Sequence, residues 1–198
     1  QSTVSIGMML VQSVVNSFGS EMLAGYSAAM RIESICVVPM AAMGNAISSY
    51  TAQNIGAGRY DRVQKGYRVC YGIVAAFAAL ICLVLEPFAP PIISLFLEGE
   101  DSRLAVETGV QCIRFMGWFY GIIGLKMISD GVLRGAGDMK PFTAANLANL
   151  TLRVALAVTL APRFGIQMVW YAVPLGWAVN YLISFLRYRT GRWRSIRA

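Results

Sequence analysis

Long apolar runs, separated by short polar segments, repeat along the whole chain. A helix needs about 20 mostly apolar residues to cross the hydrocarbon core of a bilayer, and six runs approach that length. We therefore expect six transmembrane helices, over residues 3–18, 23–52, 67–85, 106–132, 142–160 and 168–186. The third is expected to break at Pro87, Pro90 and Pro91, because proline lacks a backbone donor. A short apolar piece, 92–97, and an acidic stretch, 98–101, follow it.

Basic residues are divided unequally between the two sets of loops. One set carries eleven: Arg59, Arg62, Lys65 and Arg68 after the second helix, Arg134 and Lys140 after the fourth, and Arg187, Arg189, Arg192, Arg194 and Arg197 after the sixth. The opposite set carries only Arg103 and Arg163. Lysine and arginine accumulate on the cytoplasmic side of membrane proteins, so we assign the crowded side to the cytoplasm. The alternation also fits an even number of helices.

The composition agrees with an all-α membrane protein in which six helices form a bundle. Hydrophobic residues make up 57%, charged residues 14%, and the mean hydropathy is +0.56. The net charge of +7 is spread over short loops, so we expect the lipid bilayer as partner and not nucleic acid. Histidine is absent and the four cysteines show no metal-binding spacing. We therefore expect neither an enzyme nor a bound cofactor or metal.

Six charged residues lie at least two residues inside the ends of the expected helices, where each costs about 2.5–3.5 kcal/mol to insert. They are Arg31, Glu33, Arg114, Lys126, Asp130 and Arg153. Arg31 and Arg114 could also reach the membrane interface with their long side chains. Lys126 and Asp130 are four residues apart on one helix face, and mutual neutralisation is favoured over a functional role for this pair.

Three of the expected helices have a polar side, which predicts a bundle that encloses or borders water. The stripes are Ser2, Ser5, Gln12 and Asn16 on the first helix, Ser27, Arg31, Ser34, Asn45 and Ser48 on the second, and Thr143, Asn146, Asn149 and Arg153 on the fifth. Glu33 lies on another face of the second helix, with Met30 and Met40. Hydrogen bonds between helices would also explain such stripes, at about 1 kcal/mol each. Our candidates for a substrate or ion pathway are Glu33, Arg31, Gln12, Asn16, Asn45, Asn146, Arg153 and Asp130.

Glycine and proline mark further positions in the expected helices. Gly117 and Gly121, then Gly131 and Gly135, have the small-xxx-small spacing that allows helices to approach closely. Pro39 and Pro174 lie within helices, where proline produces a kink. Such a kink can be static, or it can lie where a transporter rearranges.

Two glycine–arginine loops carry a resemblance to a known family. Residues 52–62 read AQNIGAGRYDR, and residues 133–141 read LRGAGDMKP. Together with NSFG at 16–19 and AAMRIE at 28–33, they resemble the multidrug and toxic compound extrusion (MATE) family. The match looks like its C-terminal six-helix lobe and covers essentially all of residues 1–198. Because the chain starts at Gln1 inside an apolar run, we expect a fragment that lacks the N-terminal lobe.

The resemblance implies one lobe of a twelve-helix transporter, in which two lobes are related by a pseudo-twofold axis around a central cavity. Such proteins are multi-pass proteins of the cell (inner) membrane that exchange drugs, often organic cations, for protons or sodium ions by alternating access. Gln12, Asn16, Asn45 and Glu33 would then line the cavity. Some sodium-coupled members carry acids on the helices equivalent to the first and fourth here. The first helix has none, and Asp130 lies toward the cytoplasmic end of the fourth, so proton coupling through the missing lobe is expected.

Two other functions stay open. A flippase for lipid-linked sugars would use a more cationic cavity, for which Arg31 and Arg153 are candidates. A non-transporting membrane assembly module would have no cavity, and its polar stripes would be paired from helix to helix.

Overall fold

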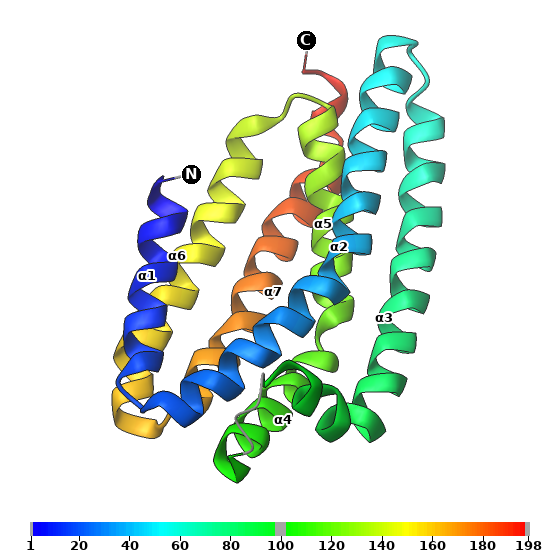
Figure 1. Ribbon diagram of the computed structural model, residues 1–198. Coiled ribbons are helices and arrows are strands. Elements are labelled where there is room, and N and C mark those ends of the chain that lie inside the picture. The colour runs from blue at the N-terminus through cyan, green and yellow to red at the C-terminus, as the bar shows by residue number, and fades with distance from the viewer. Residues whose placement is uncertain (1, 98–101, 197–198) are drawn as a thin grey trace.

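The computed structural model describes residues 2–97 and 102–196, which form a bundle of helices joined by short turns (Figure 1). The helices are α1 (Ser2–Asn16), α2 (Ser20–Gly56), α3 (Tyr60–Phe96), α4 (Arg103–Gly117), α5 (Tyr120–Gly135), α6 (Met139–Phe164), α7 (Gln167–Arg189) and the short 3-10 helix η1 (Arg192–Arg194). Of these, α2, α3, α6 and α7 are long and apolar enough to cross a membrane, and α1 is a shorter apolar helix. The expected acidic stretch 98–101 lies outside the described residues, as does Arg197.

The third expected helix does not break at its prolines, which corrects the sequence prediction. Helix α3 continues through Pro87, Pro90 and Pro91 to Phe96, and its last turns bend across the end of the bundle toward α4 (Figure 1). Proline in a helix deprives the carbonyl four residues earlier of its donor. For Pro90 that carbonyl belongs to Glu86, and the Nε of Arg114 donates a hydrogen bond to it at 3.0 Å. Arg114 thus stabilises the bend.

The fourth expected helix is in fact two helices, α4 and α5, separated by a turn at Trp118 and Phe119. The backbone N–H of Phe119 donates to the carbonyl of Met116 at 2.9 Å, a tighter turn than an α-helix makes. The run 106–132 is mostly apolar and contains no proline, so its pattern gave no sign of this change of direction. Tertiary packing decides it, because α4 packs against α2 and α3 while α5 packs against α2, α3 and α7.

Glycine brings α2 and α5 into close contact. A Cβ atom on Gly131 would lie 2.4 Å from the carbonyl oxygen of Gly44, and one on Gly135 would lie 2.2 Å from that of Ser48. The expected close approach is therefore confirmed for this pair. It is wrong for Gly121, beside which a Cβ would meet nothing within 4 Å.

The three basic segments lie at one end of the bundle, as the charge pattern predicts. The α2–α3 turn, the α5–α6 turn and the C-terminal end of the chain all appear at the top of Figure 1. Gly58 and Gly137 adopt positive φ values of 70° and 75° in the two turns, a conformation that glycine adopts without strain. We refer to this end as the basic end.

Trp193 of η1 closes the basic end. Its side chain is buried beside Tyr60 and Tyr188, and its Nε1 donates to the carbonyl of Tyr188 at 3.0 Å. Nearby, Arg187 of α7 makes two hydrogen bonds to Asp138, of 2.6 and 3.2 Å. The aspartate of the LRGAGD sequence therefore ties the α5–α6 turn to α7.

Candidate functional site

One candidate site lies between α1, α2 and α6, in a cavity of about 360 Å³. We call it the Glu33 pocket. Its walls are Met8, Val11 and Gln12 of α1, Tyr26, Met30, Glu33, Ser34 and Val37 of α2, and Arg153 of α6. Three of the predicted pathway residues, Glu33, Gln12 and Arg153, are thus brought together from helices far apart in the sequence.

The chemistry of the Glu33 pocket is mixed. The positive charge of Arg153 acts on Glu33, so the two charges balance within the pocket. Methionine and valine make up much of the remaining wall, and methionine side chains adapt readily to ligands of different shapes. The volume lies within the range of about 300–1,000 Å³ that is typical of small-molecule sites. The pocket could therefore accommodate a small amphipathic molecule.

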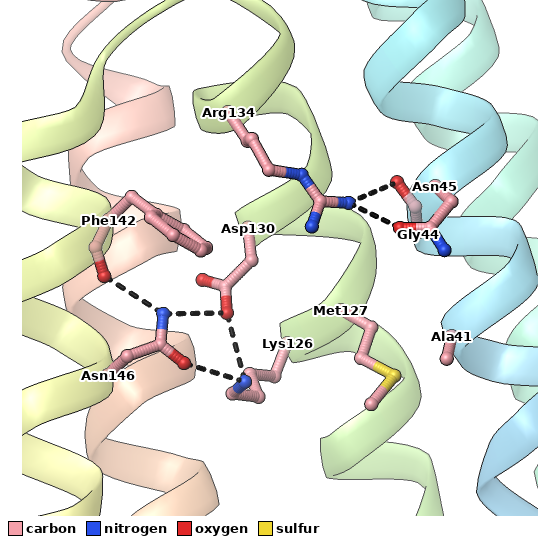
Figure 2. A pocket seen from close by; sticks show the side chains of 9 residues that line it. All are labelled: Ala41, Gly44, Asn45, Lys126, Met127, Asp130, Arg134, Phe142 and Asn146. Carbon is pink, nitrogen blue, oxygen red and sulfur yellow. Dashed lines mark hydrogen bonds and ion pairs between the residues drawn. The ribbon is translucent and has the colours of Figure 1, made fainter. Parts of the chain in front are cut away.

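A second candidate site lies between α2, α5 and α6, in a cavity of about 190 Å³ (Figure 2). We call it the Asp130 pocket. Its walls are Ala41, Gly44 and Asn45 of α2, Lys126, Met127, Asp130 and Arg134 of α5, and Phe142 and Asn146 of α6. Asp130, Asn45 and Asn146, predicted from three separate helices, share this pocket.

Asp130 is buried, forms an ion pair with Lys126 and accepts two hydrogen bonds. Its Oδ2 lies 3.0 Å from the Nζ of Lys126 and 3.4 Å from the Nδ2 of Asn146, as Figure 2 shows. Its Oδ1 accepts from the hydroxyl of Ser184 on α7 at 2.5 Å. The predicted neutralisation of Asp130 by Lys126 is therefore present. The carboxylate also joins α5 to both α6 and α7, and the contribution of Ser184 could not be read from the spacing of residues.

Arg134 is a site residue that the sequence analysis assigned only to a loop. It belongs to the last turn of α5, and its side chain extends across the pocket toward α2 (Figure 2). Its Nη2 donates to the Oδ1 of Asn45 at 2.7 Å, and its Nε lies 3.4 Å from the hydroxyl of Ser48. A signal was available, because Lys126, Asp130 and Arg134 follow one another at intervals of four residues on one helix face.

Two predicted pathway residues lie elsewhere. Arg31 is exposed on α2, and Asn16 is exposed at the last residue of α1. Neither belongs to the walls of the Glu33 pocket or the Asp130 pocket. Both residues lie on the polar stripes that the sequence predicts, but only part of each stripe lines a pocket.

A cluster of hydroxyl groups near the basic end escaped the sequence analysis. The hydroxyl of Ser129 lies 2.9 Å from those of both Tyr67 and Tyr71, and Tyr71 also donates to Tyr181 at 3.1 Å. The ring of Tyr67 stacks on that of Tyr188 at 3.9 Å between centroids. These contacts join α3, α5 and α7. The sequence alone could not indicate the cluster, because its members come from three helices that are far apart in the chain.

Comparison with known proteins places this architecture in a family. Residues 1–159 match the MatE protein family. The protein named "Probable multidrug resistance protein YpnP" from Bacillus subtilis (strain 168) is 31% identical over 192 residues, which are 96% of this chain and 42% of that protein. The chain thus spans less than half the length of this relative.

Solved structures share the fold. An outward-facing multidrug resistance MATE transporter of the MOP superfamily superposes with a TM-score of 0.84 at 21% identity, covering 98% of this chain and 44% of the other. An inward-facing structure of such a transporter also gives a TM-score of 0.84 at 21% identity, over 98% of this chain and 46% of the other. The chain belongs to the MATE family and has the fold of a single lobe of its transporters.

Proposed function

We propose that the protein exports small organic, mostly cationic compounds by secondary active antiport, with this chain as its C-terminal lobe. The observation that carries the proposal is the Glu33 pocket. It places a carboxylate inside an adaptable, partly apolar cavity of about 360 Å³ within the membrane-spanning bundle. A carboxylate in such surroundings can attract an organic cation or take up a proton, and the two would then compete for one group.

Alternating access is the expected mechanism, since the chain matches a lobe equally well in an inward-facing and an outward-facing transporter. Equal similarity to both states supports a lobe that keeps its internal packing while it moves against a second one. The second lobe would be the N-terminal half of the protein. The basic end would face the cytoplasm, in the inner membrane of a bacterial cell.

Protons are the favoured coupling ion, with sodium as the alternative. Helix α1 carries no acidic residue between Ser2 and Asn16, and Asp130 already pairs with Lys126 and accepts hydrogen bonds from Asn146 and Ser184. Neither position offers a free carboxylate to a sodium ion. Glu33 and an acid of the other lobe remain as candidates for proton exchange.

Transport of lipid-linked sugars by a flippase is less well supported. Arg153 acts on Glu33 and so adds no net positive charge to the Glu33 pocket, and Arg31 lies outside it. A non-transporting assembly module would not require a mixed polar and apolar cavity inside the lobe. Drug export accounts for both observations.

Substitution of Glu33 by glutamine in the full-length protein tests the proposal. We expect Glu33→Gln to abolish most ethidium efflux from right-side-out membrane vesicles driven by a pH gradient with the acid side outside, with expression unchanged. Glu107→Gln is the matched control, since Glu107 is exposed on α4. Wild-type efflux by Glu33→Gln would remove Glu33 from the mechanism. Efflux driven only by a sodium gradient would assign sodium as the coupling ion.

A further inference from the structure

The Asp130 pocket contains more positive than negative charge. Lys126 and Arg134 are the cations on its walls, and Asp130 is the one acid among its described lining residues. Lys126 and Asp130 form an ion pair with 3.0 Å between Nζ and Oδ2. The partners of Arg134 in the described part of the chain are all neutral: Asn45, Ser48 and the carbonyl of Gly44. The positive charge that remains is therefore located at Arg134.

The hydrogen-bonding capacity left over in this pocket consists of donors. Both carboxylate oxygens of Asp130 already have partners: Oδ2 pairs with Lys126 and accepts from Asn146, and Oδ1 accepts from Ser184. Arginine only donates, so the atom of Asn45 that faces Arg134 is its oxygen, and the NH₂ group of Asn45 keeps its donors. Within residues 2–97 and 102–196, Lys126 contacts Asn146 and Asp130, and no acceptor is recorded for the second NH₂ group of Arg134, so both cations keep donors for a ligand.

These donors come from different walls of the pocket: Asn45 from α2, and Arg134 and Lys126 from positions two turns apart on α5. A ligand that satisfies all of them needs negative charge and acceptor oxygens pointing in several directions. A tetrahedral phosphate has both properties, and arginine and lysine are its usual partners in proteins.

The size of the pocket limits what can bind. Its volume of about 190 Å³ is below the roughly 300 Å³ at which sites for whole drug-sized ligands begin, so it suits a single head group. The pocket also lies toward the basic end, since Arg134 is in the last turn of α5. Basic pockets between transmembrane helices on the cytoplasmic side commonly hold lipid phosphates.

We propose that the Asp130 pocket binds a phosphate group, with Arg134 as its main contact and Lys126 and Asn45 as further donors. The group can belong to an anionic phospholipid or to a soluble phosphate. This inference goes beyond the proposed export function, because binding to the lobe does not require transport.

Thermal unfolding of the purified protein in detergent tests this proposal. The ligands are phosphatidylglycerol, inorganic phosphate and, as controls, phosphatidylcholine and sodium chloride at equal ionic strength. We expect phosphatidylglycerol, phosphate or both to stabilise the wild-type protein, and the two controls to have no such effect. Arg134→Gln should weaken the binding by about tenfold or more, as expected when one charge-assisted contact is lost. Arg68→Gln is the matched control, because Arg68 is exposed near the basic end outside the pocket.

Asn45→Asp keeps the test valid if Arg134→Gln fails to fold. The new carboxylate would pair with Arg134 across the present 2.7 Å contact, so the protein should fold and yet lose the response to phosphate. A response to phosphatidylglycerol alone assigns the site to a lipid head group, and a response to inorganic phosphate assigns it to a soluble ligand. An unchanged response in Asn45→Asp, or no response of the wild-type protein to either ligand, overturns the proposal.

Discussion

The ion pair between Lys126 and Asp130 provides the sharpest test of the packing of this lobe. Their side chains are only 12% and 8% exposed, and 3.0 Å separates Nζ from Oδ2. Removing one partner of a buried pair leaves an uncompensated charge, which typically costs about 3–5 kcal/mol. Replacing both partners together leaves no charge behind. Asp130→Asn should therefore destabilise the protein strongly, and Lys126→Met should restore much of the loss when the two are combined.

The measurement is a double-mutant cycle on thermal unfolding in detergent. At about 2–4 °C per kcal/mol for a chain of 150–250 residues, Asp130→Asn should lower the apparent melting temperature by about 6 °C or more. The interaction energy of the cycle should reach about 2 kcal/mol, within the range found for residues in contact. The amide oxygen introduced by Asp130→Asn can still accept a hydrogen bond from Ser184, so the loss reports mainly on the unpaired charge of Lys126.

The chain contains a matched control with the same spacing. Arg103 and Glu107 form a pair at 2.7 Å, but their side chains are 92% and 51% exposed. Because water screens such a pair, Glu107→Gln should leave the melting temperature unchanged. Additive effects of Lys126→Met and Asp130→Asn, or a loss in Glu107→Gln as large as in Asp130→Asn, would refute the reasoning.

Two further predictions concern packing. Gly131→Ala should lower the melting temperature, because the new Cβ would lie 2.4 Å from the carbonyl oxygen of Gly44 and overpacking costs about 1–3 kcal/mol. Gly121→Ala, with open space around its Cβ, should be neutral or slightly stabilising. Equal stability of the two variants would contradict the close α2–α5 contact. Trp193→Ala should lower the free energy of unfolding by about 3–5 kcal/mol, as deletion of a buried aromatic side chain does. Trp118→Ala, at a position 68% exposed, should cost little in the same unfolding assay. Similar losses of stability in the two variants would show that η1 does not close the basic end.

The sequence by itself determined the membrane character of the chain, the approximate positions of the helices and the alternation of basic and non-basic loops between them. These features follow from local composition, because the length of an apolar run and the charges beside it act within one segment. The turns at Gly58 and Gly137 also lie between the apolar runs that the sequence shows, where loops were expected. The pairing of Lys126 with Asp130 could also be predicted, because both lie on one turn of one helix.

Tertiary structure decided what depends on several segments at once. The bend of α3 is stabilised by Arg114 of α4, which donates to the carbonyl that Pro90 leaves free. The sequence of α3 alone could not predict this bond, because the donor belongs to another helix. The pockets likewise required the helices to be placed: Glu33 shares a cavity with Arg153 from α6, and Arg134 donates to Asn45 on α2. A helix face can be read from the spacing of its residues, but its neighbour is set by how all the helices pack together.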